Sequence, residues 1–197
     1  MDTRKWITLV GVVLFLGAFS PAMACTCILN HPQRSYCNSE IVLKLKIHEA
    51  TRTVSGSQAE KCYKVRVEKV LKGNVALKSL NSICTKSGTD CEYVHLSTNF
   101  HKDYLITASN NQGNISVSSC SYSVSWDELL HKQKKGVEGA YNKGCTCDII
   151  SCASRPCSTP QKTCAIEEYK GGDSENQLKN QVCVPVNSTT CRWKRIE

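Results

Sequence analysis

Cys25 and Cys27, which flank a single threonine, are the residues whose type and spacing could do the most distinctive chemistry in this chain. Residues 1–24 have the pattern of a signal peptide: a short basic region, an apolar run too short to cross a membrane, and an Ala-Met-Ala cleavage signal. Cleavage there makes Cys25 the first residue of the mature chain. Its α-amino nitrogen, partly neutral at physiological pH, and its carbonyl oxygen can then chelate a metal together. An open zinc site in an enzyme accepts such ligands in place of water.

The rest of the sequence carries no signature of catalysis. The five histidines form no His-Glu-x-x-His pattern, and neither a Gly-x-Ser-x-Gly elbow nor a phosphate-binding glycine loop is present. The cysteines are even in number, so each has an expected partner, which argues against a free thiol nucleophile. We therefore expect a protein that is not an enzyme and has no cofactor of its own.

The composition predicts a secreted protein held together by disulfides. All 14 cysteines follow the signal peptide, and an even count in an oxidising compartment predicts seven disulfides. A zinc cluster built from the Cys-x-Cys pairs is the alternative. No later stretch approaches the ~20 apolar residues that span a bilayer. We expect a monomer without a nucleic-acid partner.

The formal net charge of +8 has two interpretations. It can simply serve solubility, or it can attract acidic polysaccharides of the extracellular matrix. Lys44, Lys46, Lys64 and Arg66 alternate with apolar residues, as expected for strands with one wet face. The charge is thus explained without a ligand, and polysaccharide binding remains the second interpretation.

Residues 25–144 predict a mainly β domain. Alternation and turn chemistry place strands at 41–50, 62–71, 79–85, 104–108 and 115–120. Five short antiparallel strands suit a small barrel or sandwich, and a five-stranded OB-type barrel would fit. Flanking helices are predicted from Pro32, a good first helical residue, and from Ser125, where Ser-Trp-Asp-Glu has the spacing of a capping box.

Residues 145–197 predict a second, smaller module. They contain seven of the 14 cysteines and few apolar runs, so disulfides must hold this module together. The predicted organisation is therefore a signal peptide at 1–24, a β domain at 25–144 and a disulfide-rich module at 145–197. Asn114 and Asn187 begin sequons for N-glycosylation, one in each module.

The segment CTCILNHPQRSYCNSEIVLKLK resembles the start of a mature tissue inhibitor of metalloproteinases (TIMP). CEYVH, SSCSYSVSWDEL, KGCTCDIISCASRPC and CRW also resemble family landmarks, so the resemblance covers essentially the whole mature chain. It implies a netrin-like OB-fold domain followed by the TIMP C-terminal domain. It also implies six disulfides: Cys25–Cys91, Cys27–Cys120, Cys37–Cys145, Cys147–Cys191, Cys152–Cys157 and Cys164–Cys183. Cys62 and Cys84 depart from the usual pattern; a seventh disulfide between them is the simplest interpretation, and an intermolecular bond is the alternative.

By this resemblance the protein is a secreted inhibitor of zinc metalloendopeptidases, the matrix metalloproteinases. Cys25 would chelate the enzyme's catalytic zinc, bound in trans, through its amino nitrogen and carbonyl oxygen. Thr26 would enter the neighbouring specificity pocket. The full inhibitory ridge would comprise Cys25, Thr26, Cys27, Ile28, Thr89, Asp90, Cys91 and Glu92.

Two departures from the family pattern bear on the choice of target enzyme. Leu29 replaces a common proline, and Asp90 and Glu92 place acid where the vertebrate ridge is usually small or neutral. The alternative function is a non-inhibitory netrin-like module that binds matrix polysaccharide or a receptor. Such modules usually carry residues before the first cysteine, which would block the chelate.

Overall fold

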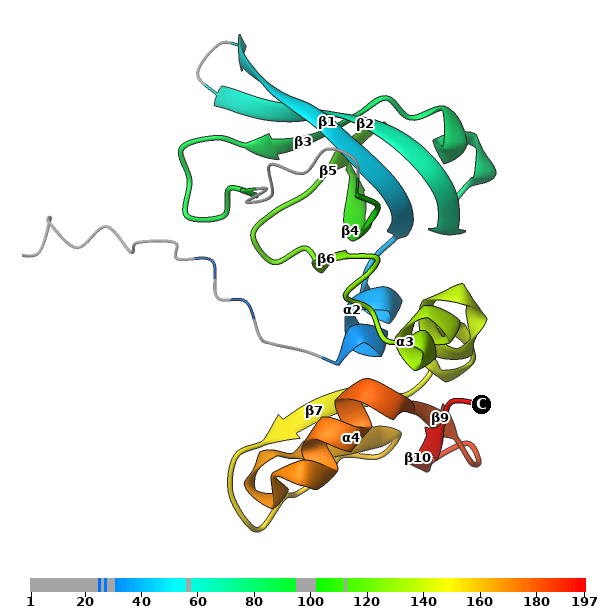
Figure 1. Ribbon diagram of the computed structural model, residues 1–197. Helices are drawn as coiled ribbons and strands as arrows, with labels where there is room; N and C mark the ends of the chain where they lie inside the picture. Colours follow the sequence, from blue (N-terminus) through cyan, green and yellow to red (C-terminus); the bar gives the residue numbers. More distant parts are fainter. Residues whose placement is uncertain (1–24, 26, 28–30, 56–57, 95–101, 112) are drawn as a thin grey trace, which may run out of the picture.

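A closed five-stranded barrel forms the first half of the protein. The computed structural model describes residues 25, 27, 31–55, 58–94, 102–111 and 113–197 (Figure 1). The sheet order is β1-β2-β3-β5-β4-β6, and an additional β1–β4 pairing closes the barrel. β3 and β5 run parallel, and the other neighbours are antiparallel. The strands are β1 (Ile41–Ser55), β2 (Gln58–Lys72), β3 (Ser82–Lys86), β4 (Tyr104–Asn111), β5 (Asn114–Ser116) and β6 (Ser123–Ser125). The predicted mainly β, OB-type fold is confirmed.

Period-two alternation determines which side chains fill the barrel. Leu43, Leu45 and Ile47 of β1 are fully buried, and most of the apolar residues that face them from β2 are buried. Lys44 and Lys46 point the other way, and both contact Asp103, at 2.8 and 3.5 Å. Part of the positive charge is therefore neutralised within the protein.

Several predicted strand boundaries need correction. β1 continues to Ser55, β2 runs from Gln58 to Lys72, and β4 continues to Asn111, so these strands are longer than predicted. The third strand begins at Ser82 rather than at residue 79, because a 3₁₀ turn, η1 (Val75–Ser79), precedes it. The Asn74 side chain caps this turn by accepting a hydrogen bond from the Ala76 amide at 2.9 Å. The last predicted strand ends at Ser116, one residue before the Val117 amide, which still donates to the Cys84 carbonyl of β3 at 2.9 Å.

The first predicted helix forms as α2 (Pro32–Asn38), but the prediction of a helix from Ser125 is wrong. Ser125 ends β6, where it pairs with Tyr104, and the Trp126 amide donates to the Asp103 carbonyl at 2.8 Å. Strand pairing thus overrides the local capping pattern. The helix α3 (His131–Lys135) begins six residues later, where Gln133 accepts a hydrogen bond from the Leu130 amide at 3.0 Å.

Gly136 is the C-terminal cap of α3. A π-type turn, η2 (Gly136–Ala140), and a 3₁₀ turn, η3 (Tyr141–Gly144), follow α3. A Cβ atom at Gly136 would lie 2.3 Å from Cζ of Tyr141, which is fully buried. Only glycine lets this turn fold over the tyrosine ring.

The C-terminal segment consists of two small sheets and a helix. β7 (Asp148–Cys152) and β8 (Thr163–Glu167) pair in parallel, and β9 (Gln181–Pro185) and β10 (Cys191–Arg195) pair antiparallel. Between them lie a 3₁₀ turn, η4 (Glu168–Lys170), and α4 (Gly172–Asn180). No helix among the described residues is long and apolar enough to span a membrane.

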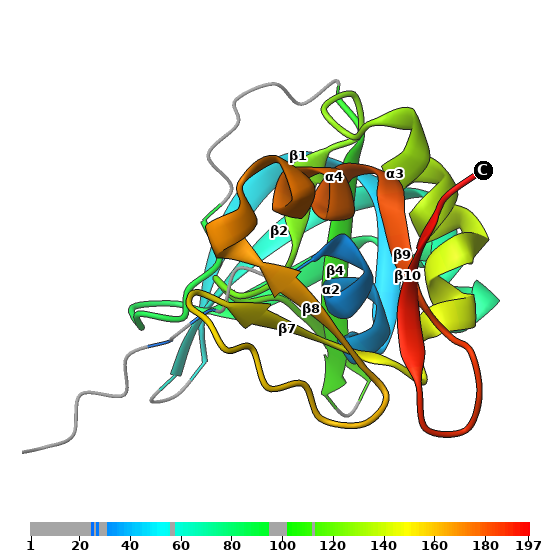
Figure 2. The ribbon, with the colours of Figure 1, turned by 90° about the horizontal axis from the view of Figure 1, so that it is seen from below.

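A second hydrophobic cluster joins the C-terminal segment to the barrel. α2 and α3 lie between the barrel and the C-terminal strands (Figure 1), and Figure 2 shows α2 surrounded by α4, β8 and β9. The cluster takes Val42 from the barrel, Tyr36 from α2, Tyr141 from η3, and Val182 and Ile196 from the C-terminal end. The two halves of the chain therefore share part of their core.

Candidate functional site

Two disulfides attach the Cys25–Cys27 segment to two loops of the barrel. Cys25 is bonded to Cys91, which follows β3, and Cys27 is bonded to Cys120, between β5 and β6. The Cα–Cα distances are 5.2 and 5.1 Å. Thr26, Ile28 and Leu29 lie outside the residues that the structure describes. Six of the eight predicted ridge residues are described, and the two disulfides bring their backbone segments together.

Ser119, which the sequence analysis did not single out, ties the two anchoring loops to each other. Its amide donates to the Cys91 carbonyl at 3.0 Å, and its hydroxyl lies 3.5 Å from the Asp90 carbonyl. The same hydroxyl lies 3.9 Å from Sγ of Cys27. Both ends of the Cys25–Cys27 segment thus rest on one connected support. The only sequence signal for this role of Ser119 is its position directly before Cys120.

The second ridge segment, Thr89 to Glu92, is a turn that exposes its tip. Thr89 and Asp90 are exposed, whereas Cys91 and Glu92 are half-buried. The Glu92 amide closes the turn by donating to the Thr89 carbonyl at 3.0 Å. Tyr93, which follows Glu92, is buried, and its amide donates to Oγ1 of Thr85 at 2.9 Å. This hydrogen bond attaches the segment to β3 of the barrel.

The Glu92 carboxylate has partners within its own loop and on the neighbouring strand. One carboxylate oxygen accepts a hydrogen bond from the Gly88 amide at 2.8 Å, and the other lies 3.5 Å from Nζ of Lys61. The Gly88 amide is the main cause of a lowered pKa for this carboxyl, with Ser87 and Lys61 contributing. The carboxylate is therefore directed into its own loop.

The remaining disulfides staple both halves of the chain. Cys62 and Cys84 lie directly opposite each other on β2 and β3 and are bonded within the chain. The structure pairs the other cysteines as the resemblance implied: Cys37–Cys145, Cys147–Cys191, Cys152–Cys157 and Cys164–Cys183. All 14 cysteines fall in the described residues, and none of them is free.

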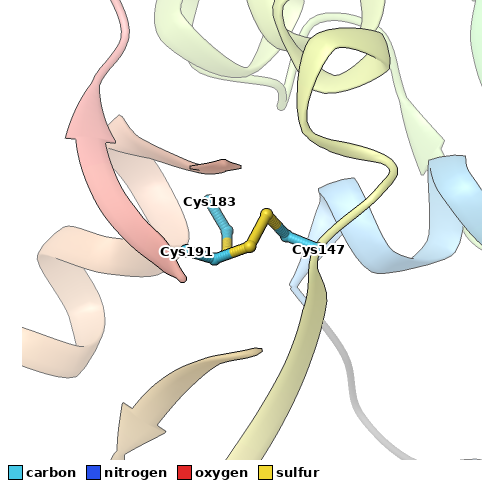
Figure 3. Close-up of side chains that lie close together, drawn as sticks. All are labelled: Cys147, Cys183 and Cys191. Carbon is cyan, nitrogen blue, oxygen red and sulfur yellow. A yellow bond between two sulfur atoms is a disulfide. The ribbon is translucent and has the colours of Figure 1, made fainter. Parts of the chain in front are cut away.

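Three sulfur atoms gather in the C-terminal segment without forming a metal site. Sγ atoms of Cys147, Cys183 and Cys191 lie within 4.8 Å of one another (Figure 3). Cys147 is bonded to Cys191, and Cys183 is bonded to Cys164. Because a cysteine binds metal as its thiolate, these disulfide sulfurs do not fit a zinc cluster.

The His-Pro-Gln segment connects the ridge to the C-terminal segment. The side-chain amide of Gln33 makes two buried hydrogen bonds to the backbone of Cys183, each 2.7 Å long. Nε2 of Gln33 donates to the Cys183 carbonyl, and Oε1 accepts from the Cys183 backbone amide. Nε2 of His31 lies 2.9 Å from the Gln177 carbonyl, and Nδ1 accepts from the Gln33 amide at 3.1 Å. This arrangement requires a neutral His31 ring with its proton on Nε2.

Acid should destabilise the protein through His31. Burial lowers its pKa from 6.5 to about 4, so the unfolded chain binds a proton there at a higher pH than the folded chain does. The contribution is complete above pH 6.5 and is lost as pH falls towards 4. We expect the free energy of unfolding to decrease by about 3 kcal/mol across this range. Denaturant titrations at several pH values measure it.

The matched control for this prediction is His48→Gln, since His48 is exposed. That variant should keep the wild-type slope of stability against pH, whereas His31→Gln should lose most of the slope between pH 6.5 and 4.5. An equal slope in all three proteins would show that His31 does not titrate on unfolding.

Comparison with known proteins identifies the family. The family described as "Tissue inhibitor of metalloproteinase" matches residues 23–193. The chain belongs to this family. It is 32% identical to "Metalloproteinase inhibitor 3" of Xenopus laevis, over 93% of this chain and 87% of that protein. It is 31% identical to "Metalloproteinase inhibitor 2" of Gallus gallus, over the same shares of the two chains.

Membership confirms two expectations. The resemblance of the cysteine framework to the TIMPs is confirmed, and these TIMP relatives are inhibitors rather than enzymes. The TIMP match runs from residue 23 through both halves of the chain, so it includes the ridge and the C-terminal segment.

Proposed function

We propose that the mature chain is a secreted inhibitor of zinc metalloendopeptidases, the matrix metalloproteinases among them, which binds the enzyme's catalytic zinc through Cys25. The observation that carries the proposal is the double anchoring of Cys25 and Cys27 on loops that Ser119 joins. Family membership and the names of the relatives, which are metalloproteinase inhibitors, support it.

In the proposed mechanism, removal of residues 1–24 frees the α-amino group of Cys25. The amino nitrogen and the Cys25 carbonyl oxygen occupy the open zinc position where the attacking water would bind. Thr26 enters the pocket beside the zinc, and Cys27 and Ile28 continue along the substrate groove. Thr89 and Asp90 contact the enzyme from the second segment. Because disulfides hold both segments in advance, little conformational entropy is lost on binding.

The proposed setting is the extracellular space or matrix, with the protein acting as a monomer. Asn114 is the first residue of β5, and Asn187 lies in the β9–β10 turn. Both residues are exposed, and we propose them as glycan sites. The second candidate, a module that binds acidic polysaccharide or a receptor, has its basis in the net charge. It needs no free Cys25 amine, so a blocked N-terminus distinguishes the two.

Thr26→Gly should weaken inhibition of enzymes whose pocket the threonine fills. Loss of a small side chain from a specificity pocket corresponds to roughly a 10- to 100-fold change. The inhibition constants should therefore change unequally across a panel of matrix metalloproteinases. Titration of each enzyme with wild-type and variant protein measures this.

Thr146→Gly is the matched control, because Thr146 stands in a second Cys-Thr-Cys sequence in the C-terminal segment and is exposed. It should leave every inhibition constant unchanged. Unchanged constants for Thr26→Gly would remove Thr26 from the proposed role.

A further inference from the structure

The turn that carries Cys91 is held mainly by one side chain. Gly88 has a φ of +74°, a conformation that other residues rarely adopt, and a Cβ there would meet nothing within 4 Å. Glycine is therefore favoured at position 88 by the positive φ of the backbone and not by a lack of space for a side chain. This path directs the Gly88 amide to the Glu92 carboxylate at 2.8 Å, and Oγ of Ser87 lies 3.3 Å from the same oxygen.

Lys61 connects the same carboxylate to the barrel. It lies opposite Thr85 in the β2–β3 pairing, and its Nζ is 3.5 Å from the second carboxylate oxygen of Glu92. The two side chains are only 26% and 21% exposed, and Nζ also lies 5.3 Å from the ring of Tyr63. Glu92 therefore links the turn, through Lys61, to a strand whose position the core determines.

We infer that Glu92 is a positioning residue, whose carboxylate holds the Ser87–Cys91 turn and thereby the Cys25 end of the ridge. The link to Cys25 is covalent, through the Cys25–Cys91 disulfide. Asp90, which is exposed at the tip of the turn, is then the acid of this segment that faces a partner. The effect on inhibition rests on the proposed function; the effect on the turn does not.

Three variants distinguish a positioning role of Glu92 from a direct charge contact between Glu92 and the enzyme. Glu92→Gln removes the charge but keeps an oxygen that can accept from the Gly88 amide, whereas Glu92→Ala removes both. Asp90→Ala removes the neighbouring exposed acid. Hydrogen exchange of the Gly88 amide reports on the turn, and the inhibition constant for a matrix metalloproteinase reports on the ridge.

Positioning predicts that Glu92→Ala speeds exchange of the Gly88 amide at least about 10-fold and weakens inhibition by a similar factor. Glu92→Gln keeps the acceptor for the Gly88 amide but loses the ion pair with Lys61, so it should change both measures less than Glu92→Ala does. Asp90→Ala should leave the Gly88 amide unchanged. Equal losses of inhibition for Gln and Ala, with exchange of the Gly88 amide unchanged in both, would assign Glu92 to charge contact with the enzyme and overturn the inference.

Exchange of the Gly88 amide also tests the inference if the wild type inhibits no enzyme. That result would contradict the proposed function but not the role of Glu92. The role of Glu92 would still be supported if the Gly88 amide lost its protection from exchange in Glu92→Ala and in no other variant. Unchanged protection in Glu92→Ala would overturn it, whatever the inhibition assay shows.

Discussion

One alanine added before Cys25 of the mature chain should abolish inhibition. An extended residue spans about 3.3–3.6 Å, whereas metal–ligand distances tolerate changes of only about 0.2 Å. The added residue converts the Cys25 amine into an amide and moves the new amine away from the zinc. We expect the inhibition constant to rise at least about 1,000-fold, equivalent to about 4 kcal/mol. Titration of an active matrix metalloproteinase measures it.

The control is one alanine added after Glu197, at the exposed C-terminal end. It has the same added mass and should inhibit like the wild type. Both proteins should keep seven disulfides and the wild-type midpoint of thermal unfolding. Full inhibition by the N-terminally extended protein would contradict zinc chelation by Cys25.

Gln33→Leu should cause the largest loss of stability among simple substitutions near the ridge. The change leaves the amide and the carbonyl of Cys183 buried without their partner. Each such group costs about 1–3 kcal/mol, so the free energy of unfolding should fall by about 2–5 kcal/mol. Gly144 packs closely against this side chain, because a Cβ there would lie 2.3 Å from Nε2 of Gln33.

Denaturant unfolding followed by fluorescence measures this loss. Gln161→Leu is the matched control, since Gln161 is exposed in the same C-terminal segment, and it should change stability by less than about 0.5 kcal/mol. Equal effects of the two substitutions would show that the Gln33–Cys183 pair contributes little.

The barrel could be predicted from the sequence because its signals are local. Lys44 and Lys46 alternate with buried residues of β1. Such alternation of polar and apolar residues is enough to predict a strand with one buried face. The helix from Ser125 was wrong because its capping pattern competed with strand pairing to Tyr104, a contact between distant positions. Local patterns cannot weigh such contacts.

The site could be predicted in part for the same reason. The cysteine spacing and the resemblance identified the segments around Cys25 and Cys91, and the structure joins these residues by a disulfide. The role of Gln33 was invisible because its partner, Cys183, lies 150 positions away. The contact of Glu92 with Lys61 was invisible as well, because Lys61 becomes its neighbour only through the β2–β3 pairing.

The most direct test of zinc chelation is the N-terminal mass of the secreted protein, followed by titration of a matrix metalloproteinase with the same sample. We predict a chain that begins at Cys25 with a free amine and inhibits the enzyme at one molecule per active site. A chain with further residues or a blocked amine before Cys25 that nevertheless inhibits stoichiometrically would contradict chelation by Cys25.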